Sequence, residues 1–368
     1  MATASARLNP FFSASTLPFH APPFDSIQEA DYLPAIEEGM KRHLAEVARI
    51  VDDPEPPTFL NTLVALERSG ELLNRVTPVF DAITSATTSD ALQEIQQHLA
   101  PRLAAHEAAI YLDPRLFDRV RAIHEQRDQL GLDPESHRLV EWYYDEFVRR
   151  GAALPEADKH QLRELNKEES TLSTLFTNRL LAAAKAGALV LTDRNALAGL
   201  SEGEIASAEF CARERNLDGA WVIPLHNTTQ QPLPVALQDR AVRRKLFNAS
   251  WARAELGDAN DTRDIVIRLA QIRAERAHLL GHASYAALAL TDQMARTPEA
   301  ALQFVRNLVP AAIVNARAER DALQAMASRE DGSFEIEAWD WDFYAEKVRR
   351  EKYDLDEERI RQYFEVDH

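Results

Sequence analysis

A histidine followed directly by a glutamate occurs twice in helix-forming stretches of this sequence, and such a pair opens the zinc-hydrolase motif His-Glu-x-x-His. On a helix, this spacing places two imidazoles on one face to bind zinc, and the glutamate activates a zinc-bound water. HEAAI contains His106 and Glu107 but ends in isoleucine, and HEQRD contains His124 and Glu125 but ends in aspartate. Neither stretch completes the motif. We therefore interpret both pairs as solvent-facing helix residues.

A second pair of histidines, His278 and His282, lies four residues apart in HLLGH. This spacing permits a shared helix face, but a zinc site requires a third ligand and a nearby base. Gly281 also weakens a helix at this point. A surface or cap pair is the simpler interpretation, and a metal-binding pair is the alternative.

Other residues with chemical potential do not form a recognisable site. The lone cysteine, Cys211, is predicted to be a half-buried apolar residue, since no histidine motif accompanies it. The acidic run DLDEE lacks the glycine and ligand spacing of a calcium loop and is predicted to begin a helix. The sequence contains no glycine-rich phosphate loop and no Gly-x-Ser-x-Gly. The acidic run consists of Asp354, Asp356, Glu357 and Glu358. We therefore assign no catalytic or metal-binding residue.

The composition indicates a helical protein with enough apolar residues for about two domains. The chain has 368 residues, of which 45% are hydrophobic and only 11 are glycine. A formal net charge of −17 without a basic stripe argues against nucleic acid as a partner. One cysteine fits a reducing compartment. Neither a membrane-spanning run nor a secretory signal is visible, so we expect a soluble cytoplasmic protein.

Hydrophobic spacing predicts the elements that position these side chains. Residues 1–27 form an extended arm, and residues 28–187 a helical domain with a long helix between Pro155 and Gly187. The stripe of that domain includes Leu60, Leu63, Leu66, Leu72, Leu73 and Val76. The predicted anchors of the arm are Phe11, Phe12, Phe19 and Phe24.

A small β element is predicted within 188–240, from the short runs ALVLTDR, GAWVIPL and QPLPVALQ. Helices resume in a second helical region, 241–368. A helix over 298–328 begins with Thr297 as the cap and Pro298 in the first turn. The predicted fold class is thus mainly α, with a small strand element. The buried face of the last helix is predicted to contain Phe304, Val305, Leu308, Ala312, Ile313, Ala316, Leu323 and Met326.

Several blocks of the sequence resemble the N-terminal portion of the thimet-oligopeptidase-type zinc metallopeptidases, in the bacterial dipeptidyl carboxypeptidase branch. They include STLPFHAPPFDSI, PTFLNTLVALERSGELLNRVTPVF, LLGHASYAALALTDQMARTPEAALQF and WDWDFYAEKVRREKYDLDEE, in the order of the family and almost from end to end. Two small departures occur: Leu60 replaces an acid or asparagine, and His282 replaces an aromatic residue.

The resemblance implies an all-α, two-lobed scaffold with a channel for oligopeptides, and a zinc-dependent release of C-terminal dipeptides. In this family the His-Glu-x-x-His helix follows the segment that resembles 339–366, so no catalytic or zinc residue transfers to this chain. We therefore expect a non-catalytic N-terminal half that binds no zinc by itself. Its expected partner is a complementary catalytic half or a second copy.

Two other hypotheses remain open. The chain is alternatively a helical module that binds peptides or a partner without cleaving them, with the strands of 188–240 as a template for an extended peptide. The remaining alternative is independent metal chemistry at His278 and His282.

Overall fold

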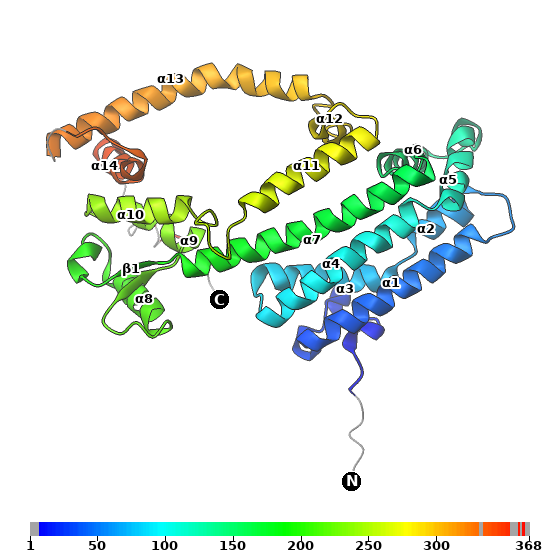
Figure 1. Ribbon diagram of the computed structural model, residues 1–368, viewed down its shortest axis with the longest axis horizontal. Helices are drawn as coiled ribbons and strands as arrows, with labels where there is room; N and C mark the ends of the chain where they lie inside the picture. Colours follow the sequence, from blue (N-terminus) through cyan, green and yellow to red (C-terminus); the bar gives the residue numbers. More distant parts are fainter. Residues whose placement is uncertain (1–6, 331–333, 354–359, 361–362, 365–368) are drawn as a thin grey trace, which may run out of the picture. The chain divides into compact units, whose positions relative to one another are not determined.

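The chain folds into two compact units, seen in a computed structural model that describes residues 7–330, 334–353, 360 and 363–364. Unit 1 comprises residues 1–176 and 265–294, and unit 2 comprises 177–264 and 295–368. Both are built mainly from helices, which confirms the predicted fold class (Figure 1). The domain boundaries predicted from the sequence stay a prediction. The acidic run at 354–358 lies outside the described residues.

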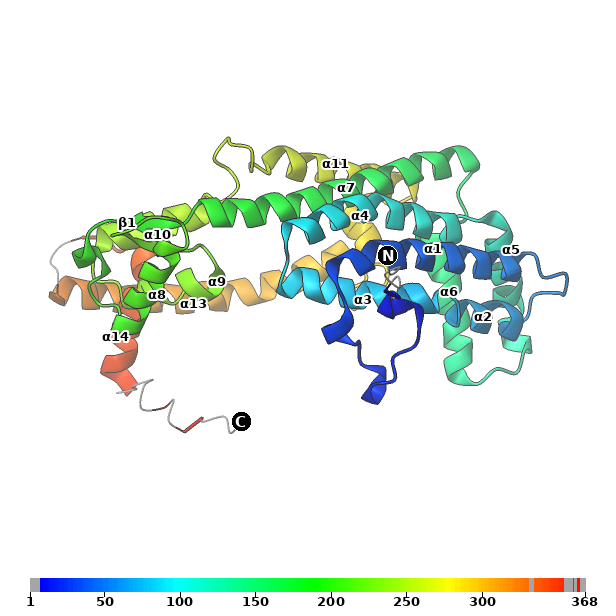
Figure 2. The ribbon, with the colours of Figure 1, turned by 90° about the horizontal axis from the view of Figure 1, so that it is seen from below.

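Unit 1 is a bundle in which α1, α3 and α4 pack side by side (Figure 2). Helices α5 and α6 each begin with an aspartate cap, Asp113 or Asp133, followed by a proline in the first turn. The unit contains α1 (Glu29–Val51), α2 (Ala65–Glu67), α3 (Glu71–Ala86), α4 (Asp90–Tyr111), α5 (Pro114–Gln126), α6 (Pro134–Arg149), the first part of α7 (Glu156–Ala186), most of α11 (Arg263–Leu279) and α12 (Tyr285–Ala289).

The leucine stripe predicted for the start of unit 1 is buried with one exception. Leu63, Leu66, Leu72, Leu73 and Val76 lie in the core, whereas Leu60 is 71% exposed. The prediction for Leu60 is wrong because Phe59–Val64 form a π-helical turn, which rotates side chains away from the positions of an α-helix.

Only one of the four predicted aromatic anchors holds the N-terminal arm. Phe11 is buried against Tyr32, with ring centroids 5.5 Å apart. Phe12, Phe19 and Phe24 are exposed, so the prediction is wrong for these three. The arm is instead fastened by polar contacts near its start, since Arg7 pairs with Asp31 at 2.9 Å. Its short 3₁₀ turns lie at Pro10–Phe12, Pro18–His20 and Phe24–Ser26.

The strand element lies in unit 2 but differs from the expected arrangement. Strands β1 (Leu189–Leu191) and β2 (Trp221–Ile223) pair antiparallel, and helix α8 (Glu202–Arg213) separates them in sequence. The predicted strand QPLPVALQ is wrong: it contains a 3₁₀ turn at Leu233–Val235. Its two prolines carry no N–H to donate to a ladder, which disfavours a strand.

Helices resume after the strand element as predicted, but α13 (Pro298–Glu330) is buried over a much shorter stretch than expected. Leu323 and Met326 lie in a core with Phe343 and Tyr344. Every residue from 302 to 321 is exposed, so the predicted buried face is wrong at Phe304, Val305, Leu308, Ala312, Ile313 and Ala316. No element among the described residues covers that part of the helix. The unit contains α9 (Asn227–Gln230), α10 (Arg240–Trp251), α13 (Pro298–Glu330) and α14 (Trp341–Tyr353).

The described helices were also compared with the length and hydropathy that crossing a bilayer requires. None of them is both long enough and apolar enough.

Candidate functional site

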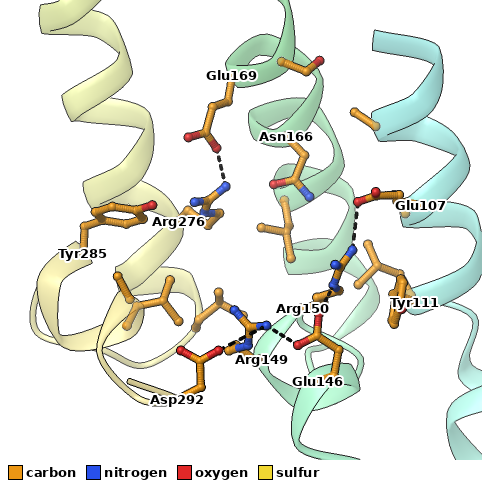
Figure 3. A pocket seen from close by; sticks show the side chains of 18 of the residues that line it. Glu107, Tyr111, Glu146, Arg149, Arg150, Asn166, Glu169, Arg276, Tyr285 and Asp292 are labelled. Atoms are coloured by element: carbon orange, nitrogen blue, oxygen red, sulfur yellow. Dashed lines mark hydrogen bonds and ion pairs between the residues drawn. The ribbon is translucent and has the colours of Figure 1, made fainter. Parts of the chain in front are cut away.

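A pocket of about 580 Å³ lies within unit 1, between helices α4, α6, α7, α11 and α12 (Figure 3). Its lining combines apolar side chains, among them Leu112, Leu162, Leu280 and Leu288, with charged side chains. Helix α6 ends at Arg149, and Gly151 just beyond it has a φ of +97° that suits glycine and lies too close to Leu162 for a Cβ. The packing of unit 1 therefore fixes the positions of the helices that surround the pocket.

Two consecutive arginines at the end of α6 share one carboxylate at the pocket wall. Glu146, which is buried, accepts hydrogen bonds from both Arg149 and Arg150. Arg150 also donates to Glu107 of α4 at 2.8 Å and lies 4.1 Å from the ring centre of Tyr111. Burial alone would lower the pKa of Arg150, but the hydrogen bond that it donates to Glu146 and the neighbouring carboxylates raise that pKa. The guanidinium therefore stays charged.

The opposite wall carries a second set of ion pairs. Arg276 of α11 bonds to Glu169 of α7, and Arg273 donates to the same carboxylate at 2.9 Å. Both arginines lie near the ring of Tyr285, at 5.5 and 5.4 Å. Asp292 faces Arg149 at 3.7 Å. The pocket thus presents arginine and carboxylate groups in alternation.

Polar atoms without a protein partner also face this pocket. Among the described residues, no hydrogen bond is formed by the side-chain amide of Asn166 or by the hydroxyl of Tyr285, and both side chains are half-buried. Figure 3 shows Asn166 between the two sets of ion pairs. Burial raises the pKa of Tyr111 above its ordinary value, so its hydroxyl stays protonated.

His106 is buried, so the interpretation of it as solvent-facing is wrong. Its Nε2 lies 3.0 Å from Nδ1 of His43 on α1, and His43 Nε2 lies 3.1 Å from Ser69 Oγ. Burial, together with the neighbouring imidazole, lowers the pKa of His106 to about 4. Ser69 Oγ donates to the carbonyl of Leu66, and His106 Nδ1 is buried without a partner. This chain of contacts joins helices, and within the described part of the chain no carboxylate is hydrogen-bonded to either imidazole.

The other histidine–glutamate pair is partly covered as well. His124 stacks on Tyr144 with ring centroids 3.9 Å apart, so it is not solvent-facing, whereas Glu125 is exposed. Glu107 is exposed too, and it belongs to the pocket described above through Arg150.

His278 and His282 do not share a helix face. Helix α11 ends at Leu279, and Gly281 adopts a φ of +79° that turns the chain before His282. Cys211 is half-buried, as predicted. Across the described part of the chain, no three histidine, cysteine, aspartate or glutamate side chains lie close enough together to hold a metal ion.

The pocket residues were not recognised in the sequence, although one signal was present. Asn166, Glu169 and Ser170 recur at three- and four-residue spacing beside core leucines of the same helix, which marks a polar stripe next to a buried one. In chemical terms the pocket combines charges of both signs with free hydrogen-bonding groups. Such a lining can bind a polar ligand, and its described side chains include no activated nucleophile.

Comparison with known proteins relates the chain to peptidases. Residues 235–368 match peptidase family M3. The chain is 53% identical over 359 residues to dipeptidyl carboxypeptidase of Escherichia coli (strain K12), covering 98% of this chain and 53% of that protein. It is 50% identical to dipeptidyl carboxypeptidase of Salmonella typhimurium, covering 97% and 52%, and 26% identical to oligopeptidase A of E. coli, covering 94% and 52%.

These matches confirm the resemblance to the thimet-oligopeptidase-type peptidases that the sequence indicates. The chain spans about half the length of the curated relatives it matches.

Proposed function

We propose that this chain forms the N-terminal, non-catalytic part of a zinc-dependent peptidyl-dipeptidase that removes C-terminal dipeptides from oligopeptides in the cytoplasm. The observation that carries the proposal is the extent of the similarity. Nearly all of the chain aligns with a dipeptidyl carboxypeptidase at 53% identity, yet it accounts for only 53% of that protein.

The described residues do not offer a site that fits zinc. None of the 11 histidines belongs to a His-Glu-x-x-His motif, and the described residues offer no cluster of three suitable ligands. A zinc hydrolase normally requires three protein ligands and a nearby base. The zinc of the proposed enzyme would therefore be held by another polypeptide segment, and this chain supplies scaffold.

The exposed stripe on α13 supports a partner for this scaffold. Its apolar residues recur at three- and four-residue spacing and continue in Leu323, Met326 and Ala327, which are buried against α14. One stripe is thus covered at one end and bare at the other. Contiguous apolar surface of this kind marks an interaction site. The bare part consists of Leu302, Val305, Leu308, Val309, Ala312, Ile313 and Ala316.

We therefore propose that the bare part of the α13 stripe packs against the segment that carries the zinc motif. Replacing Val305 and Leu308 with aspartate would abolish association with that segment, since burying an unpaired charge is costly. The matched control replaces Arg306 and Asn307, on the other side of the same turn, with aspartate. Association measured by analytical ultracentrifugation should be lost only in the first variant. Equal loss in both, or in neither, would contradict the docking face.

Activity of the chain alone tests the non-catalytic role. We expect no bound zinc by elemental analysis and no dipeptide release from an N-terminally blocked oligopeptide. Release that a chelator abolishes would overturn this role. A peptide-binding module is the second candidate, favoured by the mixed-charge pocket of unit 1. Peptide affinity retained after the α13 substitutions, together with no association with a zinc-bearing segment, would favour the module.

A further inference from the structure

The pocket of unit 1 has the dimensions of a small-molecule site. Its volume of about 580 Å³ lies within the range of roughly 300–1,000 Å³ that is typical of ligand pockets. All of its lining residues belong to unit 1, so the packing of one compact unit forms it.

The charged groups of the pocket keep free hydrogen-bonding capacity despite their ion pairs. A guanidinium has five N–H donors, yet the contacts of Arg149 and Arg276 with their carboxylates each engage a single nitrogen. Carboxylates accept several hydrogen bonds each. Glu107 and Asp292 are both more than a third exposed, which leaves their oxygens open to a ligand.

The ion pairs alone do not explain the polar groups between them. Helices can be joined by arginine–carboxylate pairs, and that is the structural alternative for this pocket. Such a role leaves no function for the amide of Asn166 or the hydroxyl of Tyr285, which line the same pocket without a partner among the described residues. Buried or half-buried polar groups are normally paired with protein, water or ligand.

The balance of charges selects the kind of ligand. An anionic ligand would be repelled by four carboxylates, and a cationic ligand would be repelled by the arginines. Each would also give up its hydration to enter the pocket. An apolar ligand would leave the polar walls unpaired. A molecule with one cationic and one anionic end avoids these costs. The pocket contains Glu107, Glu146, Glu169 and Asp292 beside Arg149, Arg150 and Arg276.

We propose that this pocket binds a short peptide with free termini, such as a dipeptide. The carboxylates hold its ammonium group and the arginines hold its carboxylate. The amide of Asn166 has one donor and one acceptor side, which complements the N–H and C=O of a peptide bond. This site does not require zinc or peptide cleavage, so it stands or fails independently of the scaffold role proposed above, and it deepens the second candidate, the peptide-binding module.

Isothermal titration calorimetry on the full chain tests the site with three probes. These are Ala-Ala, N-acetyl-Ala-Ala-amide and free alanine. The proposal predicts that Ala-Ala binds, that the doubly blocked peptide binds at least about tenfold more weakly, and that added salt weakens binding of the free peptide. Stronger binding of free alanine than of Ala-Ala would overturn the assignment to a peptide. Equal binding of the blocked and free dipeptides would overturn the charge-based recognition.

Variants at uncharged positions separate ligand binding from the ion-pair network. Asn166→Leu and Tyr285→Phe remove polar groups that have no protein partner, so the unfolding midpoint should stay unchanged. Each should weaken Ala-Ala binding by about three- to tenfold, the effect of losing one net hydrogen bond. Gln161→Leu, at an exposed position of the same helix outside the pocket, is the matched control. Wild-type affinity in both pocket variants would contradict the proposal.

Discussion

Asp340 lies at the centre of unit 2 and offers the sharpest test of how that unit is held together. Its side chain is fully buried and accepts hydrogen bonds from Arg240 at 2.8 Å, from Arg243 at 2.9 Å and from the backbone N–H of Glu337 at 3.1 Å. Arg243 is itself only 2% exposed. This carboxylate therefore joins α10 to the turn that precedes α14.

Asp340→Asn removes the negative charge but keeps the shape of the side chain. Arg243 cannot move to solvent, because its Nη1 also donates to the carbonyls of Leu237 and Gln238 at 2.8 and 3.0 Å. Its charge is left buried without compensation, which costs about 3–5 kcal/mol. With a urea m value of about 2 kcal/mol/M, the unfolding midpoint of unit 2 should fall by roughly 1.5–2.5 M.

Tryptophan fluorescence during urea unfolding is a suitable assay, because four of the five tryptophans lie in unit 2. The control is Glu351→Gln, which breaks the exposed pair with Arg329 and should leave the unfolding midpoint almost unchanged. A loss below 1 kcal/mol for Asp340→Asn as well would refute the reasoning, since the cluster would then behave as a surface ion pair.

The same cluster predicts how this difference depends on pH. Burial alone would raise the pKa of Asp340, but the hydrogen bonds from Arg240 and Arg243 lower it below its ordinary value. The stabilisation is thus fully present above the unfolded-state pKa and is lost as the pH falls through the folded-state pKa. The gap between wild type and Asp340→Asn should therefore close only in strongly acidic solution. A gap that closes near neutral pH would contradict this assignment.

Three further predictions concern stability elsewhere. The pKa of His106 falls from 6.5 to about 4 on folding, so its neutral form stabilises unit 1 above pH 6.5. That stability is lost as the pH falls toward 4. Relative to His106→Gln, the wild type should lose about 3 kcal/mol of unfolding free energy over this range, measured by urea titrations followed by circular dichroism. A stability difference between wild type and His106→Gln that stays constant across that pH range would contradict this prediction. Tyr143→Phe, which removes a 2.6 Å hydrogen bond to Glu67, should lower the free energy of unfolding by about 1 kcal/mol, and an unchanged value would show that the bond adds nothing. On α13, Leu323→Ala should lower the free energy of unfolding by about 2–5 kcal/mol, because Leu323 is buried. Val305→Ala should lower it by less than about 0.5 kcal/mol, because Val305 is exposed in this chain. Similar losses in the two variants would show that the bare stripe is covered.

Elements with strong local signals were predictable from the sequence. The long helix α7 and the start of α13 follow from proline in the first turn and from hydrophobic spacing. Helix α8 was missed between the two strands, although Ser201 and Glu204 form a capping box that announces its start. The short apolar runs on either side of α8 favoured strands, and the local pattern alone did not distinguish the helix from the strands.

Burial and site geometry depended on contacts that local pattern does not contain. His106 is buried because His43 meets it from 63 residues away, and the pocket joins Glu169 to Arg276 across 107 residues. On α13, periodicity identified an apolar face but not which neighbour covers it. The candidate site was therefore not predictable without the fold, whereas the absence of a complete zinc motif was visible in the sequence.

This chain is proposed to supply scaffold to a separate segment that carries the zinc motif. The most direct measurement is dipeptide release after mixing it with the separately purified part of E. coli dipeptidyl carboxypeptidase that it does not match. We predict no release by either polypeptide alone, chelator-sensitive release by the mixture, and loss of that release when Val305 and Leu308 are replaced by aspartate. Dipeptide release by this chain alone, abolished by a chelator, would contradict the account.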